Sequence, residues 1–345
     1  MTPPRVGISL GDPSGIGPEV VALALEVPRV VEALVPVVFG DGPTLERFPS
    51  LRALAPRTPD QLGAHPGPAR VAVTALAEKD RRPGKPTRTG GKAQLAYVEA
   101  LVRAARAGVV DALCTAPVSK EQILRTGAKF VGHTELLADA FGCEALMLMD
   151  GPRVRVALAT NHLPLRDVPR ALTVPRLTAQ LQLLAASLRP RFRRPPRIAV
   201  TGLNPHAGEG GLLGDEEVRI IAPAVARARR RGVDCQGPLP ADGLFAHPDR
   251  MPFDAVLVMY HDQGLVVSKA LDFDQTVNVT LGLPLPRTSP DHGVAYALAG
   301  TGQATPGPMI AALLKAAELA SPPRPRTRAG RTPPGPAGER GAPSR

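Results

Sequence analysis

Short apolar runs alternate with longer segments of helical periodicity along most of the chain. Runs of a few β-branched or aliphatic residues, bounded by glycine, proline or polar residues, predict strands. The expected strands are Val6–Leu10, Val35–Phe39, Arg70–Thr74, Ala112–Thr115, Ala145–Met149, Val154–Ala159, Ile198–Thr201 and Ala255–Met259. This alternation is typical of an α/β protein with a largely parallel sheet.

Two segments have the clearest helical patterns. Lys92–Ala107 has apolar residues at helical spacing and stops at Gly108. Asp215–Arg231 begins with acidic residues and ends in basic residues before Gly232, so both ends complement the helix dipole. Because no repeat or long linker interrupts the pattern, we expect residues 1–320 to form one unit of two interleaved α/β subdomains.

The composition favours a globular protein of a reducing compartment. The chain has 345 residues, of which 43% are hydrophobic, and this is ample for a sizeable core. Its three cysteines, Cys114, Cys143 and Cys235, have no close pair and so predict neither a disulfide framework nor a CxxC motif. The N-terminal residues do not resemble a signal peptide, and no run approaches the roughly 18 apolar residues of a membrane span. We therefore expect a cytoplasmic protein without a membrane partner.

The formal net charge of +11 raises the question of nucleic-acid binding. Residues 321–345 hold six arginines against one glutamate and are interrupted by proline and glycine, so we predict a disordered Arg/Pro-rich tail there. The remaining charge is spread along the chain. Three Tyr, eight Phe and no Trp are few aromatic residues for stacking on bases. A solvated basic surface is the favoured interpretation, and no nucleic-acid partner is expected.

A glycine-rich loop, GDPSGIGPE from Gly11 to Glu19, lies between the first strand and a helix that Pro18 is well placed to start. The backbone N–H groups of such a loop can bind an anion at the helix N-terminus. The loop lacks the GxGxxG spacing of a dinucleotide-binding fingerprint and the GK[ST] of a P-loop. Taken alone, it is more typical of a tight turn than of a ligand site.

Five of the seven histidines lie in polar or glycine-rich loops after apolar strands: His133, His162, His206, His261 and His292. Open α/β sheets bind ligands beyond the carboxyl ends of their strands, where His162, His206 and His261 are expected. Three imidazoles that converge there would suit Zn²⁺ or a similar divalent ion. Since the three lie far apart in sequence, their spacing does not decide between a shared metal and histidines that cap helices or bind loop carbonyls.

A cationic group lies downstream, where Lys269 and Arg287 flank Asn278. An ammonium, an amide and a forked guanidinium together make a competent receptor for phosphate or carboxylate. The alternative is that Lys269 and Arg287 only solvate the surface. Residue type alone does not decide between the two.

Several long motifs follow one another in a specific order. They are GDPSGIGPE from Gly11, TAPVSKE from Thr115, GHTE from Gly132, NPHAGEGG from Asn204, YHDQG from Tyr260, NVTLGLP from Asn278 and RTSPDHG from Arg287. With these motifs the chain resembles the 4-hydroxythreonine-4-phosphate dehydrogenase family from roughly Pro4 to Leu319. Gly243 stands where the family usually has threonine, an exchange expected to loosen the loop that holds Asp242.

The resemblance implies an isocitrate-dehydrogenase-like fold, with two α/β domains around a cleft and a homodimer that completes each active site. It assigns a divalent metal, Zn²⁺ or alternatively Mg²⁺ or Co²⁺, to His162, His206 and His261, and it allows His261 to come from the partner subunit. The substrate-binding positions that it implies are His133, Thr134, Lys269, Asn278 and Arg287. Asp242, Asp262 and Lys120 are the candidate residues for moving a proton, with a metal-bound water as the alternative. No residue is assigned to the NAD or NADP cofactor.

The reaction implied is NAD(P)-dependent oxidation of 4-phosphooxy-L-threonine to 2-amino-3-oxo-4-phosphooxybutanoate. Loss of CO₂ then gives 3-amino-2-oxopropyl phosphate for pyridoxine 5'-phosphate biosynthesis. A paralogous dehydrogenase of a sugar acid, D-erythronate or D-threonate 4-phosphate, is the nearest alternative and differs only in the group at C2. From another class, a metal-dependent hydrolase or phosphotransferase could use the same histidines.

Overall fold

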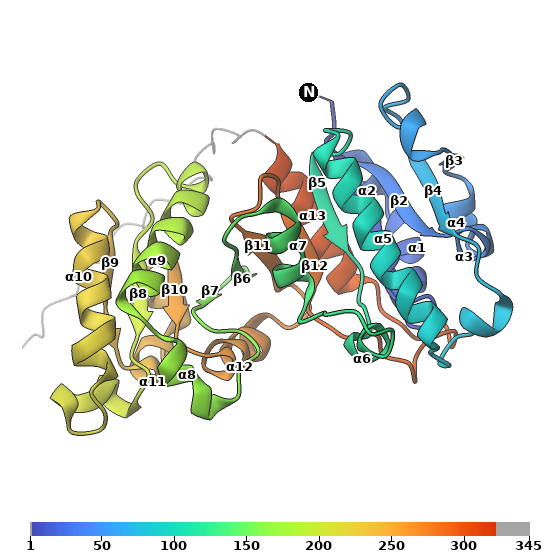
Figure 1. Cartoon of the computed structure of the whole chain (residues 1–345). Helices are drawn as coiled ribbons and strands as arrows, with labels where there is room; N and C mark the ends of the chain where they lie inside the picture. The colour runs from blue at the N-terminus through green and yellow to red at the C-terminus, as the bar shows by residue number, and fades with distance from the viewer. Residues whose placement is uncertain (1, 322–345) are drawn as a thin grey trace, which may run out of the picture.

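Within residues 2–321, which the computed structural model describes, one 12-stranded sheet runs through the molecule (Figure 1). The strand order is β3-β4-β2-β1-β5-β12-β11-β6-β7-β10-β8-β9. The strands are β1 Arg5–Ser9, β2 Val35–Asp41, β3 Ala55–Pro56, β4 Ala69–Thr74, β5 Ala112–Thr115, β6 Leu146–Asp150, β7 Arg155–Leu158, β8 Ile198–Thr201, β9 Cys235–Leu239, β10 Ala255–Val258, β11 Val277–Leu281 and β12 Arg287–Pro290. The tail predicted from residue 321 lies outside the described residues, apart from Ser321.

The sheet has two parallel parts that run in opposite directions. The strands from β3 to β12 pair in parallel, and so do β7, β10, β8 and β9. Between them, β11 is antiparallel to both β12 and β6, and β6 is antiparallel to β7. The largely parallel sheet is thus confirmed, and the strand direction reverses at its centre. Because β12 pairs with β5, the end of the chain returns to the N-terminal side of the sheet.

Every predicted strand is present, with ends within two residues of the prediction. Strands β3, β9, β11 and β12 were not predicted. In β11 and β12, polar residues such as Asn278, Thr280 and Ser289 interrupt the apolar pattern, and these segments were interpreted only as motifs. They become strands because their neighbours in the sheet form hydrogen bonds with their backbone groups. A local sequence pattern does not reveal such pairing with distant parts of the chain.

Helices pack on both faces of the sheet. Helices α5 and α13 pack against its N-terminal part, and α9 and α10 pack against its other part (Figure 1). They are α1 Gly17–Leu25, α2 Pro28–Ala33, α3 Gly42–Arg47, α4 Pro49–Arg52, α5 Arg88–Arg106, α6 Lys120–Leu124, α7 His133–Phe141, α8 Val168–Ala171, α9 Val174–Leu188, α10 Ala222–Arg230, α11 Ala241–Phe245, α12 His261–Asp272 and α13 Gly307–Ala320. In the part of the chain that the structure describes, none of them combines the length and apolar character that a membrane crossing requires.

Both predicted helices are present, the first as α5. The second is divided, because a π-helical segment at Glu217–Ile221 precedes α10. There the Ala222 N–H donates to the carbonyl of Glu217 five residues earlier, and Pro223 has no N–H with which to continue the usual pattern. Pro18 lies in the first turn of α1, as predicted.

The central strands have two different faces. Leu148 of β6 and Val279 of β11 belong to the main apolar core, which α9 and α13 cover. On the opposite face, Met147, Asn278 and Arg287 line a cavity. Because side chains alternate between the faces of a strand, the same strands supply packing on one side and polar groups on the other.

Candidate active site

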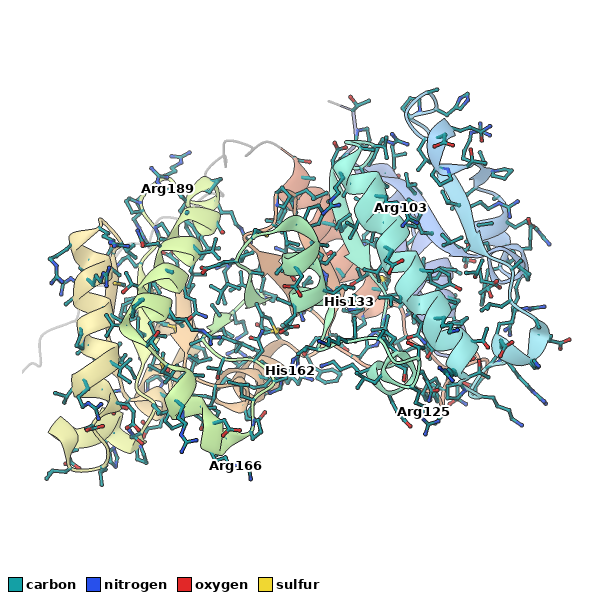
Figure 2. All side chains as sticks on the ribbon, viewed as in Figure 1. Arg103, Arg125, His133, His162, Arg166 and Arg189 are labelled. Carbon is teal, nitrogen blue, oxygen red and sulfur yellow. The ribbon has the colours of Figure 1, made fainter. Side chains whose placement is uncertain are left out.

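A cavity of about 370 Å³ lies on the polar face of the central strands. Its wall comes from the loop after β5, the first turn of α7, strands β11 and β12, and the segments after β7, β10 and β12. Figure 2 shows two of its residues, His133 and His162, in the middle of the molecule between the two parts of the sheet. The cavity thus gathers side chains from most of the motifs that the sequence singled out.

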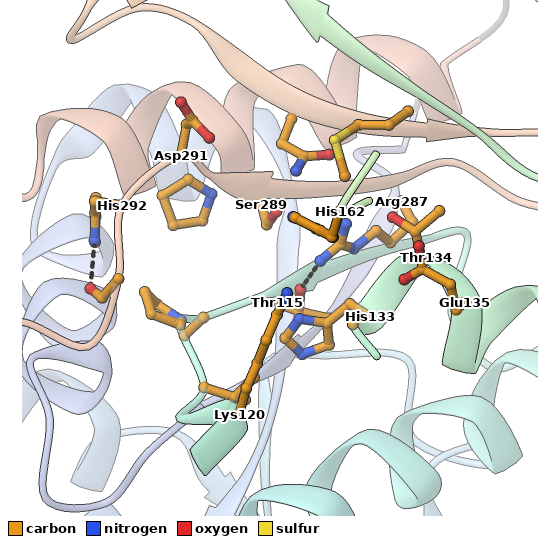
Figure 3. Close-up of a pocket in the computed structure, with 18 of the residues that line it drawn as sticks. Thr115, Lys120, His133, Thr134, Glu135, His162, Arg287, Ser289, Asp291 and His292 are labelled. Carbon is orange, nitrogen blue, oxygen red and sulfur yellow. Dashed lines mark hydrogen bonds between the residues drawn. The ribbon is translucent and has the colours of Figure 1, made fainter. Parts of the chain in front are cut away.

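Arg287 is the deepest cation of this cavity, with only 2% of its surface exposed. One of its terminal nitrogens donates to Thr280 Oγ1 at 3.1 Å. The other donates to Thr115 Oγ1 (Figure 3). Its Nε has no hydrogen-bond partner, and no ion pair with an acid is found among the described residues. Burial lowers the pKa of Arg287 to about 10, so the side chain stays charged at neutral pH. Surface solvation is therefore wrong for Arg287, and a buried cation without a counter-ion suits an anionic ligand.

His133 and Thr134 begin helix α7 beside this guanidinium (Figure 3). Burial lowers the pKa of His133 well below its ordinary value, and the charges of Arg287 and Lys120 act in the same direction, so the ring is neutral. Its Nε2 is buried without a hydrogen-bond partner. The hydroxyl of Thr134 lies 3.5 Å from that of Thr280. A neutral imidazole and a hydroxyl at a helix N-terminus can donate hydrogen bonds to an anion.

The other predicted substrate-binding residues lie on the same wall. Asn278 lines the cavity, and its buried Oδ1 has no hydrogen-bond partner among residues 2–321. Lys269 is more exposed, and its Nζ lies 3.2 Å from Asp291 Oδ2. Lys120, the first residue of α6, is exposed and also lines the cavity. The structure thus brings together all five predicted substrate-binding residues and one of the three candidates for moving a proton.

Two of the three predicted metal ligands, His162 and His261, face each other across 5.6 Å between ring centroids. Burial lowers the pKa of His162, and Lys120 adds to the effect, which favours the neutral imidazole that metals bind. His261 Nδ1 lies 2.7 Å from Asp262 Oδ1, so Asp262 orients the ring and Nε2 is left for a ligand. These two histidines fit part of a metal site.

His206 does not join them on the cavity wall. It is exposed and sits in the loop after β8 with a left-handed backbone, at φ 52°. Within the described residues of this one chain, no group of three His, Cys, Asp or Glu side chains is placed to hold a metal ion. A complete ligand set therefore needs a group from outside the single chain or a movement of the His206 loop.

Asp242 also lies off the cavity wall, exposed in the short helix α11. Its neighbour Gly243 has open space around it, since a Cβ added there would meet no atom within 4 Å. A threonine would fit at this position without a clash. The sequence had treated Asp242 and Asp262 alike, whereas only Asp262 contacts a residue of the cavity.

The glycine-rich loop before α1 is a tight turn with its N–H groups already bonded. Ser14 N–H donates to Asp12 Oδ1, Gly15 N–H to the Asp12 carbonyl, and Ile16 N–H to the carbonyl of Val294. The Asp12 side chain is 1% exposed, and burial raises its pKa. These bonds leave no free N–H group at residues 14–16 for an anion, in agreement with the tight-turn interpretation.

Several functional candidates escaped the sequence analysis. Thr115, Glu135, Ser289 and Asp291 line the cavity, and Asn161 is hydrogen-bonded to Glu135. Membership in the quoted motifs was the available signal: Thr115 opens TAPVSKE, Glu135 closes GHTE, and Ser289 and Asp291 lie in RTSPDHG. Their meeting on one cavity wall depends on strand pairing that the local sequence does not reveal.

Comparisons with known proteins identify the family of the chain. Residues 32–316 match the family model described as pyridoxal phosphate biosynthetic protein PdxA. The chain belongs to this family. It is 47% identical to a 4-hydroxythreonine-4-phosphate dehydrogenase of Geobacter metallireducens over 326 residues, which cover 92% of this chain and 96% of that protein. A relative of the same name in Burkholderia vietnamiensis is 45% identical, over 92% of this chain and 96% of the relative.

Solved structures of similar proteins have the same mixed α/β fold. A 4-hydroxythreonine-4-phosphate dehydrogenase from Burkholderia phymatum has a TM-score of 0.76 at 38% identity and covers 92% of this chain and 99% of its own. A terephthalate 1,2-cis-dihydrodiol dehydrogenase from Burkholderia xenovorans has a TM-score of 0.63 at 31% identity, with 92% and 98% covered. The α/β prediction is confirmed. Since dehydrogenases with different substrates share this fold, substrate choice has to be argued from the residues of the cavity.

Proposed function

We propose that the chain oxidises 4-phosphooxy-L-threonine at C3 with NAD(P)⁺, as a 4-hydroxythreonine-4-phosphate dehydrogenase. The product, 2-amino-3-oxo-4-phosphooxybutanoate, then loses CO₂ to give 3-amino-2-oxopropyl phosphate. One observation supports this most strongly: Arg287, a fully buried guanidinium without an ion pair in the described residues, lies beside a neutral His133 in a cavity that His162 and His261 also line. PdxA-family membership and the names of the relatives point to the same reaction.

Arg287 and Lys269 hold the anionic ends of the substrate, the phosphate and the carboxylate. His133, Thr134 and Asn278 add hydrogen bonds that fix its orientation against the nicotinamide. Of the three candidates for moving a proton, Lys120 is favoured because it lines the cavity. Asp262 orients His261 instead, and Asp242 lies off the wall.

His162, His206 and His261 hold a divalent metal, with the set completed between the subunits of a homodimer. His162 and His261 support this because both lie on the cavity wall and Asp262 orients one of them. A divalent ion held by these residues would supply Lewis acidity for the oxidation and for the decarboxylation that follows.

The enzyme acts in the cytoplasm on a small substrate, without a nucleic-acid or membrane partner. Its exposed arginines support this, since Arg103, Arg125, Arg166 and Arg189 lie at separate points of the surface (Figure 2). Residues 1–320 act as one catalytic unit of two interleaved α/β subdomains. The return of β12 to the N-terminal side of the sheet supports the interleaving.

The test is the absorbance at 340 nm when the purified chain meets 4-phosphooxy-L-threonine, with NAD⁺ and NADP⁺ assayed in parallel. We expect reduction of the cofactor, release of CO₂, and loss of activity after exhaustive chelation that Zn²⁺, Mg²⁺ or Co²⁺ restores. Full activity after chelation would contradict the metal assignment. Absence of any change at 340 nm with metal present would contradict the dehydrogenase.

A further inference from the structure

Glu135 has a carboxylate oxygen that lacks a partner. Its Oε1 accepts a hydrogen bond from Asn161 Nδ2 at 3.3 Å, whereas its Oε2 is buried and unpaired within residues 2–321. Because a carboxylate only accepts, the Asn161 amide must turn its nitrogen toward Glu135, which leaves Asn161 Oδ1 as a further acceptor. That oxygen is also buried without a partner in the described chain. Two hydrogen-bonded side chains thus offer two acceptor oxygens for which the fold supplies no donor.

Helix stabilisation does not account for this arrangement. Glu135 is the third residue of α7, from which a glutamate often reaches back to the N–H of the cap residue. Its Oε2 does lie against Gly132, so closely that a Cβ there would be 2.8 Å from it, but the two groups form no hydrogen bond. An acid that only complemented the helix dipole could do so while exposed to water. It would not have to bury an unpaired oxygen, which costs desolvation energy.

The charges of the cavity set Glu135 apart. Glu135 and Asp291 are the two carboxylates on its wall, and Asp291 already lies 3.2 Å from Lys269 Nζ. No ion pair joins Glu135 to a cation in the described part of the chain. Arg287 on the same wall likewise forms no ion pair among the described residues, and the charge of Glu135 raises its pKa without offsetting the effect of burial. The cavity therefore has an unpaired positive group and an unpaired negative group, which suits a ligand that has both charges.

We propose that Glu135, with Asn161, binds the C2 ammonium of the substrate and selects the amino acid ester over the corresponding hydroxy acid. The role of Glu135 rests on the proposed function, since this ammonium belongs to its substrate. An ammonium has three N–H donors, of which Glu135 Oε2 and Asn161 Oδ1 accept two. A hydroxyl at C2 has no positive charge, so the sugar-acid ligand leaves the buried carboxylate without a counter-ion while it still occupies Arg287.

Binding without turnover tests this role directly. Isothermal titration of the full chain, in one Zn²⁺-containing buffer without NAD(P)⁺, gives dissociation constants for 4-phosphooxy-L-threonine and for D-threonate 4-phosphate, the sugar acid with the same configuration at C2 and C3. The variants are Glu135→Gln, which keeps the shape and removes the charge, and Glu135→Asp, which keeps the charge and shortens the side chain. Glu121→Gln is the matched control, because Glu121 lies in the first turn of α6, exposed and paired with Arg125.

We expect wild type to bind the amino ligand more tightly than the sugar acid. Glu135→Gln should weaken the amino ligand by about 10- to 100-fold, the range for a hydrogen bond to a charged group, and change the sugar acid by less than about 3-fold. Glu135→Asp should lie between wild type and Glu135→Gln. The Glu121→Gln control should bind both ligands like wild type.

Equal weakening of both ligands in Glu135→Gln would overturn the proposal, since it would mean that Glu135 only positions Asn161 and His162. An unchanged preference for the amino ligand would overturn it as well. The 340 nm assay separates the two levels. If the chain binds the amino ligand through Glu135 but does not reduce NAD(P)⁺, the dehydrogenase is contradicted and the ammonium site is not. If the chain turns over the substrate and Glu135→Gln weakens both ligands equally, only the ammonium site is contradicted.

Discussion

Asp150 and Arg287 are both buried charged residues of the central strands, and their surroundings differ. The Asp150 side chain, 1% exposed in β6, lies within 3.3 Å of cationic nitrogens of Arg155, Arg191 and Lys315. Arg287 in β12 binds two threonine hydroxyls and forms no ion pair with an acid within residues 2–321. Asp150 is neutralised by the fold itself, on the face that α13 covers. Arg287 is left for a ligand, on the face that lines the cavity.

The comparison separates stability from function. Burial alone would raise the pKa of Asp150, but Arg191, Lys315 and Arg155 outweigh it and lower that pKa, so the folded state favours the charged form. Burial lowers the pKa of Arg287, so the folded state disfavours its charge. A charge that the fold disfavours is retained at a cost in stability, and in a cavity this is typical of a binding or catalytic group.

Asp150→Asn should give the largest effect, a loss of about 3 to 5 kcal/mol in the free energy of unfolding, because it leaves three cations without their buried anion. Urea unfolding measures it. Asp249→Asn, which removes an exposed carboxylate 2.9 Å from Arg153, is the matched control and should cost less than about 1 kcal/mol. Equal losses in the two variants would show that burial does not set the strength of these pairs.

The same ion pairs predict a dependence on pH. Since the pKa of Asp150 is lower in the folded than in the unfolded state, its contribution is fully present above the unfolded value of about 3.9 and is lost as the pH falls through the folded value. As the pH is lowered below 4, the free energy of unfolding should therefore fall less steeply for Asp150→Asn than for wild type. Parallel stability curves for the two proteins would contradict this assignment.

Arg287→Met should reverse the pattern, with kcat/KM lowered about 30- to 1000-fold, or roughly 2 to 4 kcal/mol, and stability unchanged or raised. The methionine removes a charge that the fold does not pair. Arg287→Lys should also be poorly active, because an ammonium does not reproduce the forked contacts. Arg125→Met, at an exposed arginine outside the cavity, is the control. Near-normal kcat/KM in both Arg287 variants would remove this residue from the site.

The contrast between these residues was only partly visible in the sequence. The apolar strands could be predicted because each is a short run with clear boundaries. The motifs also identified Arg287, Lys269 and His133 as members of one site. Burial of Arg287 could not be predicted, because it depends on the pairing of β12 with β11 and β5, which are distant in sequence. Asp150 gave no signal, since its cations come from β7, α13 and the turn at Arg189–Arg191.

The histidines show the same limit. Position after strands β7, β8 and β10 predicted that His162, His206 and His261 would lie at one edge of the sheet. His162 and His261 do meet, because β7 and β10 are neighbours. The loop after β8 departs from the edge through a run of left-handed residues from His206 to Gly211, and a local backbone path of this kind has no simple sequence signature apart from its glycines.

Glu318→Gln should give the smallest effect and sharpen the comparison. Glu318 lies 2.7 Å from Lys315 and 3.5 Å from Arg191, so it touches two of the cations that Asp150 also contacts. Its side chain is 54% exposed, and water can replace its contribution, so we expect a loss below about 1 kcal/mol by urea unfolding. A loss as large as that of Asp150→Asn would mean that the acids and cations of this cluster act as one network. A small loss would show that the buried carboxylate of Asp150 contributes most of the stability of this cluster, as the contrast with Arg287 requires.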